Sequence, residues 1–87
     1  MKLFHRTTES AADAIIASQS WVSKENTQEV YFSSAQSGGE ADGYGTAVLS
    51  VDVPVTVAHL DDEFPDGEQH FRVSIDDLAG RTIIRER

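Results

Sequence analysis

The chain has 87 residues, no cysteine and a formal net charge of -8 from fifteen acidic and seven basic side chains. This length allows one small domain, residues 1–87. The missing thiols exclude disulfides, thiolate zinc sites and a catalytic cysteine. The charge disfavours broad binding to nucleic acid or to anionic lipid, and no apolar stretch approaches the roughly 20 residues of a membrane span. Because the first residues also lack the apolar core of a signal peptide, we expect a cytoplasmic protein.

The first half of the chain predicts a strand, a helix and a second strand. Residues 2–6 start apolar and end polar, as in a strand that enters a turn. Alanine and isoleucine at helical spacing predict a helix over residues 9–18, with Thr8 or Ser10 as its N-cap. Residues 29–33 have the aromatic and β-branched composition of a strand.

Two loops are predicted around that second strand. Residues 19–28 are polar except for Trp21 and Val22, which is typical of a loop held in place by the tryptophan. Glycines are concentrated between residues 37 and 45 and indicate a flexible connection. Their spacing matches neither the dinucleotide-binding fingerprint nor a P-loop, so neither nucleotide motif is present.

The second half of the chain predicts further strands. Every odd position from Ala47 to Val57 is apolar, and a strand is expected to end near Pro54, with residues 55–60 partly extended. The segments expected after it are an acidic turn, a strand, a second turn and a last strand, over residues 61–67, 69–75, 76–80 and 81–85. We therefore expect an α+β domain, in which one N-terminal helix packs on a small, mainly antiparallel sheet of four to five strands.

Oxygen and imidazole ligands are concentrated in the acidic turn and beside it. They are His59, Asp61, Asp62, Glu63, Glu68 and His70. Their spacing matches neither an EF-hand loop nor a zinc-binding H-E-x-x-H motif, so we expect a solvated acidic turn and no metal site. The same run also suggests an alternative function, a non-enzymatic interaction module whose face from Asp61 to Glu68 binds a basic protein partner.

The block His5-Arg6-Thr7-Thr8 lies where the first predicted strand meets the helix. Free N–H groups and the dipole at a helix N-terminus favour an anion, and Arg6 adds a guanidinium fork. His5 can hydrogen-bond a ribose hydroxyl, and Thr7 or Thr8 can cap the helix or bind a ligand. In the plainer interpretation Thr8 caps the helix, His5 packs half-buried and Arg6 pairs with a surface acid. The block is therefore a candidate clamp for a ribose and its phosphate.

The same block, followed by alanines and isoleucines at helical spacing, resembles the opening of small ADP-ribosyltransferase-like domains and of their relatives, the RNA 2′-phosphotransferases. Residues 30–33, Val-Tyr-Phe-Ser, resemble the aromatic-x-Ser motif in the middle strand of that superfamily. The resemblance implies NAD as the ligand. The cofactor-binding residues are then His5 for the nicotinamide ribose, Arg6 for the diphosphate, Tyr31 or Phe32 with Ser33 for the nicotinamide, and Thr7 as a further ligand donor.

The resemblance also implies a catalytic carboxylate on a late strand. By order along the chain this is Glu68, ahead of Glu63 and Glu40, and it would stabilise the positive charge that develops on the ribose as nicotinamide leaves. Gln69 or His70 occupies the place where some members carry that glutamate, and the chain is shorter than most members. The implied function is transfer of ADP-ribose or phosphate to an acceptor that the sequence does not identify.

Overall fold

The structure is a computed structural model that describes residues 1–22, 27–36 and 42–87. Its strands are β1 (Lys2–Thr7), β2 (Glu29–Ser33), β3 (Ala47–Asp52), β4 (His59–Glu63), β5 (Gln69–Ser74) and β6 (Ile84–Arg85). Its helices are α1 (Glu9–Ser18) and α2 (Ile75–Leu78), with 3-10 turns η2 (Asp42–Tyr44) and η3 (Val55–Val57). The expected α+β class is confirmed, with one long helix and an antiparallel sheet of six strands instead of four to five. None of the described helices is long and apolar enough to cross a membrane.

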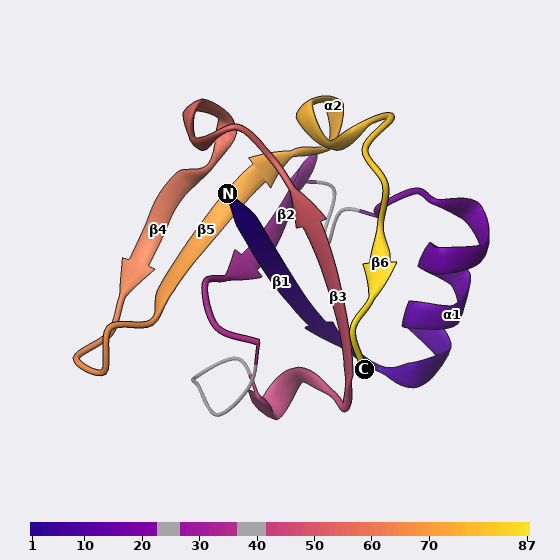
Figure 1. The fold of residues 1–87 in the computed structure, drawn as a ribbon, viewed down its shortest axis with the longest axis horizontal. Helices are drawn as coiled ribbons and strands as arrows, with labels where there is room; N and C mark the ends of the chain where they lie inside the picture. The colour runs from indigo at the N-terminus through magenta and orange to yellow at the C-terminus, as the bar shows by residue number, and fades with distance from the viewer. Residues whose placement is uncertain (23–26, 37–41) are drawn as a thin grey trace.

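The strand order β4-β5-β2-β1-β3-β6 places the first strand near the middle of the sheet (Figure 1). Every neighbouring pair is antiparallel. Strand β1 pairs with β3 along its whole length, but it is in register with β2 only at Phe4 and Ser33. The two strands run at an angle to each other in Figure 1. The β4-β5-β2 part of the sheet is therefore joined to the β1-β3-β6 part at one register position, where Phe4 of β1 pairs with Ser33 at the end of β2.

Helix α1 begins and ends where the sequence predicts. The Thr8 hydroxyl accepts a hydrogen bond from the Ala11 N–H at 3.2 Å, so Thr8 and not Ser10 is the N-cap. At the other end Gln19 adopts the left-handed conformation, with φ of 52°, which stops the helix. Ala12 and Ile15 are the buried side chains of the helix. The capping role expected of Thr8 in the plainer interpretation is thus confirmed.

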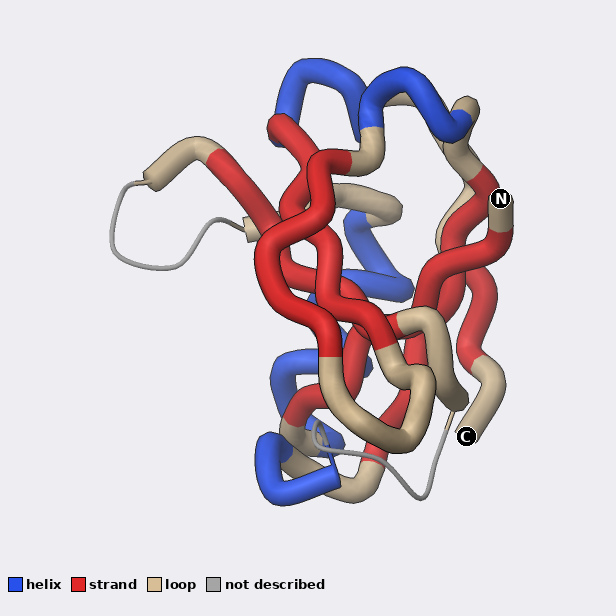
Figure 2. The backbone as a smooth tube through the Cα atoms, turned by 90° about the vertical axis from the view of Figure 1, so that its left-hand side faces the viewer, coloured by secondary structure: helices blue, strands red, loops and turns tan. Residues whose placement is uncertain are grey.

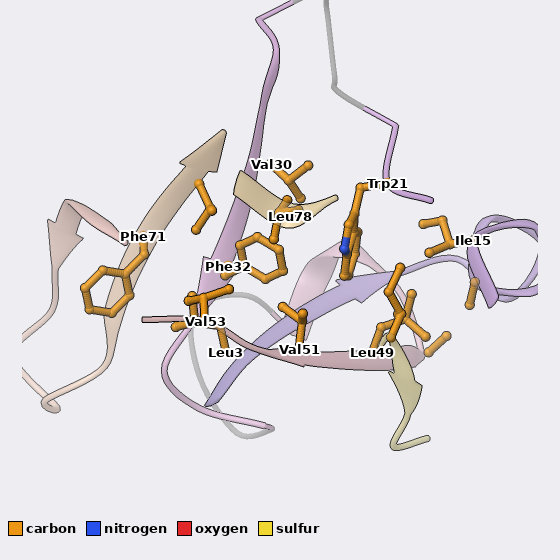
Figure 3. Packing of buried hydrophobic residues seen from close by; sticks show 14 residues of the cluster. Leu3, Ile15, Trp21, Val30, Phe32, Leu49, Val51, Val53, Phe71 and Leu78 are labelled. Carbon is orange, nitrogen blue, oxygen red and sulfur yellow. The ribbon is translucent and has the colours of Figure 1, made fainter. Parts of the chain in front are cut away.

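The hydrophobic core is formed by the strands, with α1 and Trp21 at one end (Figure 3). Its buried side chains are Leu3, Ala12, Ile15, Trp21, Val30, Phe32, Ala47, Leu49, Val51, Val53, Phe71, Val73, Leu78 and Ile83. Trp21 is 8% exposed and packs edge-to-face on Phe32, with ring centroids 5.1 Å apart. The tryptophan therefore holds its loop as predicted, although residues 23–26 of that loop lie outside the described part of the chain.

The predictions fail mainly after Pro54. Residues 55–57 form η3 and are not extended, and strand β4 occupies the start of the predicted acidic turn. All five side chains of β4 are exposed, because β4 is an edge strand, and it is part of the hairpin nearest the viewer in Figure 2. Without a buried face, a strand has no period-two pattern to reveal it.

The C-terminal elements also differ from the prediction. Residues 75–78 form α2 where the end of a strand and a turn were expected, because the Ser74 hydroxyl accepts a hydrogen bond from the Asp76 N–H at 3.1 Å and caps a helical turn. The last strand shortens to Ile84–Arg85. In the glycine-rich connection residues 42–44 form η2, and residues 37–41 lie outside the described residues.

Candidate functional site

A cleft of about 630 Å³ opens beside the contact between β1 and β2. Its walls come from β1, β2, η2 and the β4–β5 hairpin. Four of the residues predicted to bind a cofactor line the cleft: His5, Arg6, Tyr31 and Ser33. Phe32, the alternative to Tyr31, also lines it. Thr7 is not among the lining residues. The structure therefore gathers most of the predicted ligand-binding residues, which come from two distant segments of the chain, around one cavity.

His5 is held in a defined protonation state by its surroundings. Its Nδ1 lies 2.8 Å from the Tyr31 carbonyl oxygen, and because a carbonyl only accepts, Nδ1 carries the proton. The ring also packs edge-to-face on Trp21 and Phe32. Burial lowers the pKa of His5 from its usual 6.5, against the smaller opposite effect of the Tyr31 hydrogen bond. Near neutral pH, His5 thus presents Nε2 as a hydrogen-bond acceptor.

The lowered pKa of His5 predicts a pH dependence of stability. The unfolded chain binds a proton on His5 more readily than the folded protein does. Protonation of His5 therefore does not reduce the free energy of unfolding above about pH 6.5, and it reduces that free energy progressively as the pH drops towards the folded pKa. Urea unfolding between about pH 5.5 and 7.5 measures the slope. We expect His5→Asn to reduce it and the exposed control His59→Asn to keep it. An NMR titration midpoint of His5 at or above 6.5 would contradict this prediction.

The Arg6 guanidinium donates hydrogen bonds to the backbone of two loops. Its Nη1 donates to the Gly45 carbonyl and its Nη2 to the Gln36 carbonyl, each at 3.1 Å. These bonds connect β1 to the segment after β2 and to the segment before β3. The guanidinium is thereby oriented at the wall of the cleft, which it lines together with His5.

Ser33, Glu68 and His70 form a hydrogen-bonded cluster behind the cleft. The Ser33 hydroxyl donates to Glu68 Oε2 at 2.6 Å, and His70 Nε2 lies 2.6 Å from the same oxygen. The Ala35 N–H donates to the Ser33 oxygen at 3.0 Å and so helps to direct the hydroxyl proton towards Glu68. The pairing of β2 with β5 places Ser33 opposite His70, which explains why the three residues meet.

The face predicted from Asp61 to Glu68 contains both exposed and buried acidic side chains. Asp61 and Asp62 lie exposed on edge strand β4 and also line the cleft, and Asp61 Oδ1 accepts from Arg72 at 3.4 Å. Glu68 is 5% exposed and points inwards, so it does not belong to the exposed face on which it was expected. Within residues 1–22, 27–36 and 42–87, no group of three histidine, aspartate or glutamate side chains is placed to hold a metal ion.

The sequence interpretation did not assign His70 to the ligand-binding residues. His70 lines the cleft with a side chain that is 20% exposed, whereas the side chain of Glu68 is 3% exposed and is not among the lining residues. Phe64, which also lines the cleft, packs edge-to-face on the His70 ring with centroids 4.7 Å apart. The signal for this arrangement is the spacing of two residues between Glu68, which directly precedes β5, and His70 within β5, because extended residues two apart lie on the same face.

No protein-family model, curated protein or solved structure matches the chain. The resemblance to ADP-ribosyltransferase-like domains is therefore carried by the short motifs around His5 and Ser33.

Proposed function

We propose that the chain is a minimal NAD-binding domain of the ADP-ribosyltransferase-like kind, which transfers ADP-ribose from the dinucleotide to an acceptor. The observation that carries this proposal is that His5 and Ser33 line one cleft, and that Ser33 is hydrogen-bonded to the carboxylate of Glu68, which lies behind the wall of that cleft. These residues come from three segments of the chain and have the types and the order that the resemblance requires. The cavity of about 630 Å³ falls within the range of about 300–1,000 Å³ that is usual for small-molecule sites.

The groups that surround the cleft suit the parts of a nicotinamide dinucleotide. The acceptor nitrogen of His5 can take a hydrogen bond from a ribose hydroxyl, because the other ring nitrogen already donates to Tyr31. The rings of Tyr31 and Phe32 supply an aromatic wall for the nicotinamide, and Arg6 supplies a guanidinium for the diphosphate. These are contacts of binding and orientation.

A buried carboxyl group lies next to this cleft. Glu68 accepts a hydrogen bond from Ser33, is hydrogen-bonded to His70, and lies behind the wall that these two residues form. A fixed carboxylate in a poorly solvated position stabilises positive charge on a nearby ribose more strongly than it would in water. This carboxylate therefore favours the loss of nicotinamide over mere retention of the dinucleotide.

We expect saturating NAD to raise the unfolding temperature and to shift the backbone amide signals of His5, Arg6, Tyr31 and Ser33 in a proton–nitrogen NMR titration. A ligand at 100 times its Kd stabilises the folded state by about 2.7 kcal/mol, which is easily measured. Arg6→Gln should weaken NAD binding, and Arg81→Gln is the matched control because Arg81 does not line this cleft.

Separate titrations with ADP-ribose and with inorganic phosphate distinguish recognition of the dinucleotide from capture of an anion. Phosphate that reproduces all the shifts caused by NAD would point to simple anion binding at Arg6. The proposed function is wrong if saturating NAD causes neither a thermal shift nor signal changes around the cleft.

A further inference from the structure

One oxygen of Glu68 is shared by two neighbours of different exposure. Ser33 and His70 both lie 2.6 Å from Oε2, and Glu68 itself is separated from the cleft. His70 is the member of this cluster that both touches the carboxylate and carries a titratable ring into the wall of the cleft. Any proton that passes between a ligand and the buried carboxylate therefore has a direct route through the imidazole.

The charge state of Glu68 determines which nitrogen of His70 can act. When Glu68 is ionised, its oxygen only accepts, and Nε2 then carries the proton of this hydrogen bond. In the neutral ring Nδ1 then holds a lone pair. A carboxylate that orients an imidazole in this way selects its tautomer and stabilises the imidazolium that forms when the free nitrogen takes up a proton. The edge-to-face packing of Phe64 further fixes the plane of the ring.

We propose that His70 is the general base of the cleft and that the acceptor it activates carries a hydroxyl group. This inference rests on the proposed function. In the step, the acceptor oxygen forms a bond to the ribose carbon that carries nicotinamide, and the bond from that carbon to the nicotinamide nitrogen breaks. Its electron pair leaves with neutral nicotinamide. The hydroxyl proton moves to Nδ1 of His70 and is later released to water. Glu68 and Ser33 act as positioning residues.

The charges around His70 favour a hydroxyl over an anionic acceptor. Glu68 faces the ring from its own strand, Ser33 lies opposite it on β2, and Asp62 lies opposite it on β4. Asp61 and Asp62 also line the cleft and would repel a phosphate or carboxylate acceptor. Such anions are nucleophilic without a base, whereas a hydroxyl keeps its proton at neutral pH and gains from general-base catalysis. Water or an alcohol is thus the acceptor class that this geometry suits.

The first test measures nicotinamide release from NAD, with water or a small alcohol as the acceptor, as a function of pH. We expect kcat/KM of the wild-type chain to fall as the pH is lowered, because a protonated imidazole cannot accept the proton of the acceptor. His70→Asn should lower kcat by about 10² to 10⁴ with little change in NAD affinity, and it should abolish this acid limb. His59→Asn is the matched control, because His59 does not line the cleft. His70→Asn that keeps both the rate and the acid limb would overturn the inference.

The second test needs no activity and uses the unliganded wild-type protein. Nitrogen NMR of the neutral His70 ring should show a protonated Nε2 and an unprotonated Nδ1, and the opposite tautomer would overturn the inference. This measurement, with the wild-type pH profile, decides the matter even if His70→Asn fails to fold. A chain that does not bind NAD, or that binds NAD and releases no nicotinamide, contradicts the proposed function, whereas release of nicotinamide by His70→Asn at the wild-type rate contradicts only the role of His70.

Discussion

Gly45→Ala is expected to destabilise the protein by about 3 kcal/mol or more, which is a large part of the 5–15 kcal/mol typical of a whole domain. A Cβ at this position would lie 2.1 Å from the Thr7 carbonyl oxygen and 2.3 Å from the Thr7 carbonyl carbon. Both are backbone atoms of β1 that cannot rotate away. The φ of Gly45, 149°, is also one that residues with a side chain rarely adopt. Urea unfolding of the variant measures the loss.

Two other glycines serve as controls that distinguish the effect of the steric clash on stability from the effect of backbone strain. Gly43→Ala should change the stability by no more than about 0.5 kcal/mol, because a Cβ there meets nothing within 4 Å and the backbone is not left-handed. Gly67→Ala keeps open space but has a φ of 93°, so it should cost only about 1–2 kcal/mol from conformation. If Gly45→Ala unfolded at the same urea concentration as Gly43→Ala, the close contact with Thr7 would be disproved.

This contact matters for the cleft because Gly45 also holds Arg6. Its carbonyl accepts the bond from Arg6 Nη1, so a shift of Gly45 away from β1 moves the guanidinium as well. The same glycine thus sets the approach of the η2 segment to β1 and the orientation of one wall residue. The folded fraction of a Gly45→Ala variant should therefore bind NAD more weakly than the wild-type protein does.

The sequence correctly predicts the elements whose ends, or whose hydrophobic periodicity, depend on a few neighbouring residues. Thr8 begins α1 with a side-chain cap, and β3 ends at Asp52, close to Pro54, where the strand was predicted to end. The turn before β5 is likewise marked by Gly67 in a positive-φ conformation. Each of these signals depends on a few neighbouring residues, and so it can be recognised without knowledge of the tertiary structure.

The parts of the site that the sequence cannot predict depend on pairings between distant residues. Glu68 is chosen from the sequence only by its order along the chain. Its contact with Ser33 requires the register between β2 and β5, which spans 35 positions of sequence. The acceptor role of His5 depends in the same way on the Tyr31 carbonyl, which lies 26 positions away. Strand register is fixed by the whole sheet, and a local pattern does not contain it.

Ser33→Ala is expected to reduce the free energy of unfolding by roughly 1.5–3 kcal/mol at neutral pH, because it removes a hydrogen bond to a buried charge. The carboxylate of Glu68 stays buried after the substitution and loses the hydroxyl that donates to it at 2.6 Å. Adding Glu68→Gln to Ser33→Ala should recover part of the loss, since a neutral amide costs less to bury than a carboxylate. Urea unfolding of both single variants and the double variant gives the coupling between the residues.

The matched control for this prediction is Ser50→Ala. Ser50 is also buried, and its hydroxyl donates to Glu86 at 2.8 Å. Glu86, however, lies partly exposed and keeps an ion pair with Lys2, which is the main reason that its pKa is lowered. Water can replace the lost hydroxyl there, so Ser50→Ala should destabilise the protein less than Ser33→Ala. Equal effects of the two substitutions would show that Glu68 is solvated, and the buried carboxylate on which the proposed chemistry depends would then be absent.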